Sequence, residues 1–321
     1  MPTVTLLVCS SGRAPLLDRL LGTIASDGDL PDELVVVNGR DGETPAVMER
    51  YATVFQRVVL VVHPNRNLAT LRNLGLPYCS GDVVAMTDDD AVPEHGWVAH
   101  IRSAHQEDDK TGAVGGAVRG LNDRFLSRLA DAVVFPDPRP GRPMHTLPTV
   151  NMSYKRSAMR EVGEFDPRLF RGEDVDYNWR LLQAGCDIRF EPEMRVRHEH
   201  RTTLRGLYQQ QYMYGRAYVL VRAKWPEMYC VYPHRLNSPR AWAKALHCVL
   251  AIVYQPWGVA SHLPSPSERL AAYPLLVVHH LVWKLGMLRQ AAEIRMKGEP
   301  ELAGTDAADI TVWEKRARLP V

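Results

Sequence analysis

The chain has few cysteines, and none of them is spaced for a disulfide framework or a metal ribbon. The five cysteines are odd in number, widely separated and never paired as Cys-x-x-Cys: Cys9, Cys79, Cys186, Cys230 and Cys248. A small disulfide-linked fold or a zinc ribbon needs cysteines at short, paired spacings, so the pattern argues against both. A reducing compartment is the simpler interpretation, and we expect a cytoplasmic protein.

Long hydrophobic runs are also missing. The N-terminal apolar run, residues 4–8, has no charged segment before it and is too short for the core of a signal peptide. No stretch reaches 18 purely apolar residues, the length expected of a membrane span. We therefore expect neither a cleaved leader nor a spanning helix.

A strong charge of one sign is absent as well. The 39 Lys and Arg nearly balance the 37 Asp and Glu, so the whole chain has no electrostatic reason to bind nucleic acid. Residues 195–240, however, hold nine Lys or Arg against two Glu and no Asp. With 321 residues, 45% of them hydrophobic, the chain is long enough for one large core and an appendage, and any anionic partner is expected near the basic segment.

Apolar runs alternate with helix-like segments through the first third of the chain. The strand-like runs are residues 3–8, 34–37, 58–62 and 83–86, and the helix-like segments between them are 15–24, 44–55 and 68–78. This spacing is typical of βαβ units. It predicts an α/β fold with a parallel, doubly wound sheet.

Three consecutive acids, Asp88, Asp89 and Asp90, end the fourth apolar run. The run lies between Gly81 and Pro93 and reads as a buried parallel strand, so its acids belong at the carboxyl edge of the sheet. Ligands of open α/β sheets bind at that edge, and adjacent carboxylates repel unless a cation or a hydroxylated ligand lies between them. The sequence therefore predicts a divalent metal holding a phosphate; the alternative is a solvated turn.

The middle of the chain predicts more strands and a second acidic segment. Residues 113–118 and 151–154 read as strands, and the Pro-rich segment 121–148 between them as a long loop over the site. Residues 172–185 have the start and stop signals of a helix, with acids in the first turn and Gly185 after the end. The strand 188–197 then leads into His198-Glu199-His200, where a period of two places both histidines on one face.

These segments, taken in order, resemble the family 2 glycosyltransferases of the GT-A fold. The resemblance is carried by 88–90 (DDD) with Pro93, 151–152 (NM), 162–166 (VGEFD), 172–176 (GEDVD) with 179–180 (WR), and 196–198 (VRH). It covers about the first two-thirds of the chain, and the order of the motifs is more specific than any one of them. It implies a GT-A, mostly parallel sheet with flanking helices. The residues that follow resemble the family less and read as a C-terminal helical extension. The family's acid after the second strand has no clear counterpart, since residues 36–41 read VVNGRD.

The resemblance implies an inverting transfer from a nucleotide-sugar donor, with a UDP-sugar as first choice, to an acceptor hydroxyl. A Mn²⁺ or Mg²⁺ ion would neutralise the leaving diphosphate. The expected metal ligands are Asp90, Asp88 and His198, with His200 as the alternative imidazole. The expected catalytic pair is Asp174, as the general base, and Glu173, as a contact to the acceptor. The alternative role for Asp174 is that of a helix cap. The expected donor contacts are Ser10, Asn38, Asp41, Arg72, Asp88 and Asp89, and weaker candidates for acceptor or diphosphate contact are Asn151, Trp179 and Arg216.

We expect the catalytic domain to span residues 1–203, with a nucleotide-sugar half at 1–95 and an acceptor and metal half at 96–203. Residues 204–321 form the expected helical region. Within it, 245–267 has no charged side chain but is interrupted by prolines, and 275–283 reads as another apolar helix. These apolar segments could form part of the core, a homodimer face or a peripheral contact with the cytoplasmic face of a membrane. We favour the core or the dimer.

Two other function classes remain open. Asp88-x-Asp90 after an apolar strand also looks like the nucleophile motif of haloacid-dehalogenase phosphatases, although about three βα units precede it here. The basic segment 195–240, with its interleaved Tyr and Trp, could instead belong to a non-catalytic module that binds nucleic acid or anionic lipid.

Overall fold

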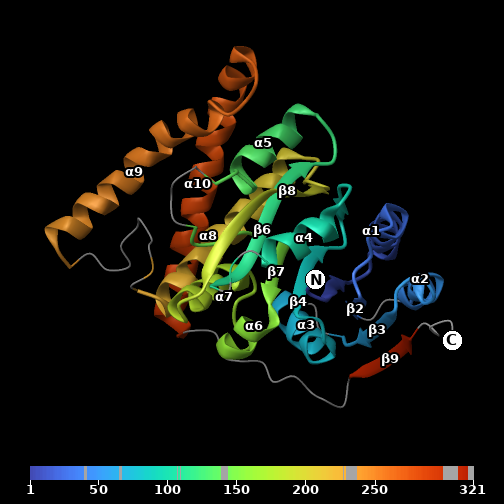
Figure 1. Cartoon of the computed structure of the whole chain (residues 1–321). Coiled ribbons are helices and arrows are strands. Elements are labelled where there is room, and N and C mark those ends of the chain that lie inside the picture. Colours follow the sequence, from blue (N-terminus) through green and yellow to red (C-terminus); the bar gives the residue numbers. More distant parts are fainter. Residues whose placement is uncertain are drawn as a thin grey trace. The chain divides into compact units, whose positions relative to one another are not determined.

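The computed structural model describes residues 1–39, 42–64, 67–106, 108, 110–138, 144–226, 228, 237–298 and 310–316. The chain divides into two compact units (Figure 1). The first comprises Met1–Leu121, Asp137–Glu199 and Leu302–Val321, and the second Asn122–Pro136 and His200–Glu301.

The first unit is built on one mixed sheet. Among the described residues the sheet has nine strands in the order β5-β8-β6-β7-β4-β1-β2-β3-β9. The strands are β1 (Val4–Ser10), β2 (Glu33–Asn38), β3 (Arg57–Val62), β4 (Val83–Asp88), β5 (Ala91–Pro93), β6 (Thr111–Gly120), β7 (Asn151–Lys155), β8 (Asp187–His198) and β9 (Thr311–Arg316). The flanking helices are α1 (Ala14–Asp27), α2 (Thr44–Tyr51), α3 (Leu68–Gly75), α4 (Trp97–Gln106), α6 (Arg156–Val162) and α7 (Glu173–Gln183).

The predicted βα units are confirmed. Strands β1, β2, β3 and β4 pair in parallel, and their apolar residues are almost completely buried. Continuous apolar runs of this kind form strands covered on both faces, which is why a Val-rich sequence rather than an alternating one marks them. The chain winds from β1 out to β3 and then returns to place β4 on the other side of β1, so β1 and β4 flank a topological switch point.

An antiparallel strand connects this parallel half to the rest of the sheet. β7 pairs antiparallel with both β4 and β6, and Thr87 is aligned with Asn151. β8 pairs in parallel with β6, so the carboxyl end of β8 reaches the same edge as the end of β4. The short strand β5 then pairs with β8 and aligns Ala91 with His198.

A close approach of two strands requires glycine at position 116. An added Cβ at Gly116 would lie 1.8 Å from the Met194 carbonyl oxygen and 2.5 Å from the Asn151 Nδ2 atom. The register between β6 and β8 also shifts between Gly116 and Ala117. Gly116 therefore allows the bulged strand β8 to pack closely against β6. This pairing continues to His198 at the edge of the sheet.

The prediction of a long loop over residues 121–148 is wrong for residues 125–134. Phe125–Val134 forms helix α5 in the second unit. Its Leu129 and Ala130 pack in an apolar cluster with residues such as Leu207 and Leu276. The helix is stabilised by partners about 80 and 150 residues away, which the surrounding Pro, Arg and Asp residues gave no means of anticipating.

The second unit also contains the long helices α8 (Leu204–Lys224), α9 (Pro239–Ala260) and α10 (Pro266–Lys297). The predicted interruption at Pro256 is wrong, because α9 continues through it to Ala260, and α10 likewise continues through Pro274. Ala260 is buried beside Ala272 and Leu276, so packing offsets the hydrogen bond that each proline removes.

Helix α10 is long and apolar enough to cross a membrane by length and composition. Within its apolar 18-residue stretch, 22% of the residues are buried. Length and composition alone are weak evidence for a membrane span, because the core helices of soluble proteins can be equally long and apolar. α8 packs along α10 through close backbone contacts at Gly215 and Gly286, and its Arg216 donates to Gln290 and Glu293. A pair of helices with these polar groups between them does not resemble a simple span.

Candidate functional site

The three consecutive acids lie at the carboxyl end of β4, as the sequence predicts. Asp88 is the last residue of the strand and is aligned with Cys9 of β1, at the switch point. The Arg13 guanidinium contacts two of the acids, with Nη2 2.6 Å from Asp89 Oδ1 and Nη1 2.6 Å from Asp90 Oδ2. Arg13 precedes α1 and was not predicted, because an isolated arginine in a turn carries no sequence pattern.

His198 joins two of these acids. A carboxylate oxygen of Asp88, a carboxylate oxygen of Asp90 and a ring nitrogen of His198 lie within 4.8 Å of one another. The His198 Nε2 atom lies 3.1 Å from Asp90 Oδ1. Two carboxylate oxygens and an imidazole nitrogen are a donor set that suits a divalent cation such as Mn²⁺.

His200 lies in the second unit and has different partners. Its Nε2 atom is 2.7 Å from Asp131 Oδ1, and its ring stacks on Phe135 with 5.6 Å between centroids. The period-two argument placed both histidines on one face, but β8 ends at His198. The structure therefore brings His198, and not His200, to the acids.

The three acids differ in electrostatic environment. Burial alone would raise the pKa of Asp90, but the hydrogen bond and charge of His198, together with Arg13, lower it to about 2. Burial raises the pKa of Asp89 to about 7 against the opposing charge of Arg13. Burial and repulsion from Asp90 raise the pKa of Asp88. Packing negative charge this closely at a buried edge is unfavourable without cations, and Arg13 and His198 supply part of the compensation.

A second acidic group begins α7. The residue before the helix, Gly172, has a φ of +78°, a conformation that glycine adopts without strain. This turn directs Glu173 and Asp174 into the first helical turn, and Asp174 Oδ1 accepts a hydrogen bond from the Val175 backbone N–H at 2.8 Å. Burial, with repulsion from Glu173, raises the pKa of Asp174 to about 6. A carboxylate with a pKa near neutrality can accept and release protons at physiological pH.

Glu173 and Arg72 form a buried ion pair. Arg72 Nη1 lies 2.6 Å from Glu173 Oε1, and Nη2 donates to Thr149 Oγ1 at 2.7 Å. Both charged residues are no more than 5% exposed. The sequence predicts Arg72 as a donor contact and Glu173 as a member of the catalytic pair. The structure pairs the two side chains, and this pairing fixes the position of Glu173, next to Asp174.

Breaking this pair should destabilise the fold. Arg72→Met leaves a buried carboxylate without its partner, and we expect a loss of about 3–5 kcal/mol in the free energy of unfolding, measured by urea titration. The double variant Arg72→Met/Glu173→Gln should recover most of the loss. Arg195→Met, which removes the exposed ion pair with Glu193, is the matched control and should cost less than about 1 kcal/mol. A single Arg72→Met variant as stable as that control would contradict a structural role for the pair.

The other predicted donor contacts lie at strand ends. Ser10 ends β1 and Asn38 ends β2, and the two are aligned across the parallel pair. Both are buried at the same edge as Asp88. Asp41 lies outside the described residues.

The three weaker candidates have different surroundings. Asn151 is fully buried: its Nδ2 donates to the carbonyl oxygens of Ala117 and Met194, and its Oδ1 accepts from Trp97 Nε1 at 2.8 Å. Asn151 thus joins β7 to the neighbouring strands. Trp179 is half-buried on α7, and Arg216, in the second unit, is paired with α10.

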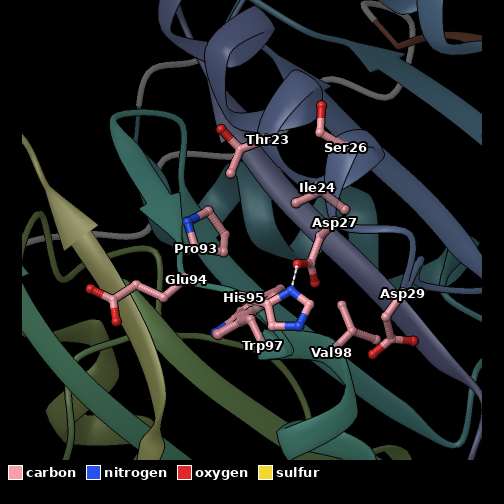
Figure 2. Close-up of a pocket in the computed structure, with 10 residues that line it drawn as sticks. All are labelled: Thr23, Ile24, Ser26, Asp27, Asp29, Pro93, Glu94, His95, Trp97 and Val98. Atoms are coloured by element: carbon pink, nitrogen blue, oxygen red, sulfur yellow. Dashed lines mark hydrogen bonds and ion pairs between the residues drawn. The ribbon is translucent and has the colours of Figure 1, made fainter.

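A pocket of about 190 Å³ lies beside α1, between its C-terminal residues and the turn that follows β5 (Figure 2). None of the predicted site residues lines it. Its acids have structural partners: Asp27 pairs with His95 and accepts from the Gly96 backbone N–H at 3.0 Å, and Asp29 accepts from Arg102 at 2.5 Å. We assign this pocket no ligand.

Comparisons with known proteins agree with this arrangement. A model of the family "Glycosyl transferase family 2" matches residues 5–163. The pre-mycofactocin glycosyltransferase of Mycobacterium tuberculosis is 31% identical over 191 residues, 56% of this chain and 40% of that protein. The glucosyl-dolichyl phosphate glucuronosyltransferase of Haloferax volcanii is 26% identical over 271 residues, 78% of this chain and 84% of that protein. The chain thus spans only 40% of the length of the first of these relatives.

The fold has a similar solved counterpart. The mannosyltransferase PcManGT from Pyrobaculum calidifontis, solved in complex with GDP-Man and Mn²⁺, superposes with a TM-score of 0.61 at 19% identity, over 90% of this chain and 87% of that one. At this identity the likeness concerns the fold. It confirms the predicted mixed, mostly parallel GT-A sheet with C-terminal helices. The sequence match and the shared fold together establish that the chain belongs to glycosyl transferase family 2.

Proposed function

We propose that the protein transfers a sugar from a nucleotide-sugar donor to an acceptor hydroxyl, with inversion at the anomeric carbon, using a divalent cation and Asp174 as general base. The observation that carries the proposal is the convergence of Asp88, Asp90 and His198 at the switch point of the sheet. Ligands of open α/β sheets bind at this place, and a leaving diphosphate requires a cation there. The names of the relatives and the GDP-Man and Mn²⁺ in PcManGT support the same reaction class. No observation favours the phosphatase or the nucleic-acid-binding alternative.

Asp88, Asp90 and His198 are the residues that would hold the cation. A bound Mn²⁺ or Mg²⁺ would supply a Lewis acid that stabilises the negative charge developing on the diphosphate. Arg13 already contacts Asp89 and Asp90, so it is placed to balance charge beside the same phosphates. The low pKa of Asp90 keeps its carboxylate ionised and ready to coordinate throughout the physiological range.

The strand ends provide the donor's other contacts. Ser10 and Asn38 lie along the edge on one side of Asp88, where a nucleoside attached to the diphosphate would extend. We propose that they contact the nucleoside, whereas Arg72 acts by positioning Glu173. A UDP-sugar is our first choice, and the experiment below compares it directly with other donors.

We assign Asp174 the role of general base for the acceptor hydroxyl; its pKa of about 6 supports this role. In its ionised form the carboxylate accepts the proton of the acceptor hydroxyl while the hydroxyl oxygen forms a bond to the anomeric carbon. The bond between that carbon and the diphosphate oxygen breaks, and the electron pair leaves with the diphosphate. One direct displacement on the opposite face inverts the anomeric configuration. Glu173, fixed by Arg72, lies adjacent and is proposed to orient the acceptor.

The site residues proposed here lie in the first unit. We therefore keep residues 1–203 as the proposed catalytic part, with the nucleotide-binding half at 1–95, and propose a separate role for the helices of the 204–321 region; strand β9 of that region pairs in the sheet of the first unit, and α5 packs in the second. A cytoplasmic location agrees with four described cysteines being free thiols, because disulfides are favoured in oxidising compartments.

A thermal-shift panel tests the proposal. UDP-, GDP- and dTDP-sugars are each added with Mn²⁺ and with EDTA, and the cognate donor at one hundred times its dissociation constant should stabilise the protein by roughly 2.7 kcal/mol. We expect one nucleotide class to stabilise, and only when Mn²⁺ is present. Free nucleoside monophosphates serve as the control for unspecific binding. Stabilisation by none of the nucleotide sugars would overturn the proposed reaction.

A further inference from the structure

Helix α9 has a continuous apolar face that is exposed. Its members are 48% to 61% exposed: Trp242, Leu246, Val249, Leu250, Val253, Tyr254 and Trp257. Successive spacings of three or four residues, with two adjacent pairs, place them on one side of a helix. The expectation that this segment forms core is therefore wrong for this face.

α9 packs within the second unit through the side opposite this face and through its C-terminal end. Ala251 is buried on the opposite side, Ala260 is buried at the end of the helix, and the Tyr273 hydroxyl on α10 donates to the Val253 carbonyl oxygen at 3.0 Å. The Trp257 and Tyr273 rings meet edge to face, with centroids 5.9 Å apart. α10 thus holds α9 in a fixed orientation, and the large side chains of α9 are left at the surface. Contiguous apolar faces of this size mark an interaction site rather than ordinary surface.

The charges on α9 indicate what the apolar face meets. Arg240 and Lys244 are exposed near its start, and residues 237–267 contain no Asp or Glu. Aromatic residues lie near both ends of the face, with Trp242 at one end and Tyr254 and Trp257 at the other. Indole and phenol rings favour the boundary between lipid headgroups and acyl chains, and lysine and arginine can reach lipid phosphates from it.

We propose that α9 lies in the headgroup layer of a bilayer containing anionic lipid, parallel to the surface, with its apolar face buried. An apolar face with basic flanking residues is the pattern of an interfacial helix. A second copy of the chain is the other simple occupant. It would cover the leucines and valines, but α9 has no acid to pair with Arg240 and Lys244 of the other copy, whereas lipid phosphates neutralise them.

Helix α10 extends the same kind of surface. Its Leu270, Val278, Leu281, Leu285 and Leu288 are 41% to 71% exposed, and they too recur every three, four or eight residues. The other side of α10 is occupied by α8 through Gly215 and Gly286. One face of α10 is therefore available to lipid, while its polar contacts with α8 stay inside the unit.

Co-sedimentation with vesicles tests this surface. The full chain is mixed with phosphatidylcholine vesicles and with vesicles containing 30% phosphatidylglycerol, at low and high salt; these compositions are experimental choices of roughly physiological charge density. We expect binding to the anionic vesicles that weakens with salt. Vesicle binding requires no sugar donor, so its result is distinguishable from that of the thermal-shift panel.

Two sets of variants separate the apolar and basic contributions. Leu246→Glu/Leu250→Glu changes two exposed residues and should lower the partition coefficient by roughly tenfold or more. Arg240→Gln and Lys244→Gln should each weaken binding to anionic vesicles by about fivefold, as expected for about 1 kcal/mol per charge, and leave binding to neutral vesicles unchanged. Leu204→Glu, which changes an exposed leucine at the start of α8, is the matched control and should bind as the wild type does. Circular dichroism confirms that each variant is folded.

Three outcomes would overturn the proposal. The first is the absence of wild-type binding to anionic vesicles. The second is binding that the Leu246→Glu/Leu250→Glu variant retains in full, which would assign it to another surface. The third is a concentration-dependent dimer, detected by light scattering, that the same double variant disrupts without changing vesicle binding, which would make the α9 face a contact between two copies.

Discussion

Asp90→Ala is expected to abolish Mn²⁺-dependent donor binding and leave the protein folded. The carboxylate lies within 4.8 Å of the ligand atoms of Asp88 and His198, and it is the member of the cluster held most strongly in the ionised form. Removing it takes away a ligand and leaves the charge of Arg13 with one acid fewer to balance it, which disfavours a cation. The residue follows a strand and lies outside the apolar core, so the variant should stay folded. The loss of its ion pairs with Arg13 and His198 lowers the free energy of unfolding, and the relief of repulsion with Asp88 offsets part of that loss.

Titration calorimetry with Mn²⁺ and the cognate donor measures this effect, and thermal melting checks the fold. Asp187→Ala, which removes an exposed acid that pairs with Lys110, is the matched control and should bind donor normally. Donor binding that survives both EDTA and Asp90→Ala would rule out the proposed metal site.

The two histidines provide an internal comparison. His198→Ala should weaken metal-dependent donor binding less than Asp90→Ala does, because two carboxylates remain. His200→Ala should not change it, since His200 is paired with Asp131 in the second unit. The reverse order of effects would show that His200 is the ligand.

The parallel half of the sheet could be predicted because its signal is local. Buried strands such as β2 and β4 are continuous apolar runs, and the helices between them have their own periodicity. Helix α5 and strand β9 could not be predicted in this way. α5 depends on partners far away in the chain, and β9 is an edge strand whose side chains are mostly exposed and whose sequence, TVWEKR, alternates weakly. Such elements are set by tertiary contacts rather than by propensity.

The candidate site shows the same division. Asp88, Asp90 and His198 lie next to recognisable strand ends, so the topology alone brings them together. Arg13, which pairs with Asp89 and Asp90, belongs to no sequence motif and could not be predicted as their partner. Arg72 and Glu173 are 101 residues apart, and the sequence contained no signal that their side chains would pair and be buried. Spacing therefore predicted which acids and histidine converge at the sheet edge, and it missed Arg13 and the Arg72–Glu173 pairing.

Asp174→Asn is expected to leave donor binding intact and to lower turnover by roughly two to four powers of ten, the contribution of general-base catalysis. The amide keeps the size of the side chain and can still accept from the Val175 backbone N–H. It cannot take the acceptor's proton. Initial rates at saturating donor and acceptor measure the loss, and calorimetry with the donor checks that binding is unchanged.

The pH dependence identifies the base independently. Because burial raises the pKa of Asp174 to about 6, the wild-type rate should fall as the pH drops below about 6, where the carboxylate becomes protonated. The residual activity of Asp174→Asn should lack this limb, whereas the activity of Asp176→Asn, which changes a buried acid paired with Arg180, should retain it.

The same raised pKa predicts the effect on stability. A carboxyl whose pKa is higher in the folded state stabilises the fold fully at pH values below its unfolded pKa, and that contribution is lost as the pH rises through the folded value of about 6. At pH 7.5 the wild type therefore carries an ionised, partly buried carboxylate that the amide variant does not have. Asp174→Asn should melt at the same or a higher temperature than the wild type at that pH. If it instead melts at a markedly lower temperature and turns over normally, Asp174 supports the start of α7 and the base must be sought at Glu173 or Asp176.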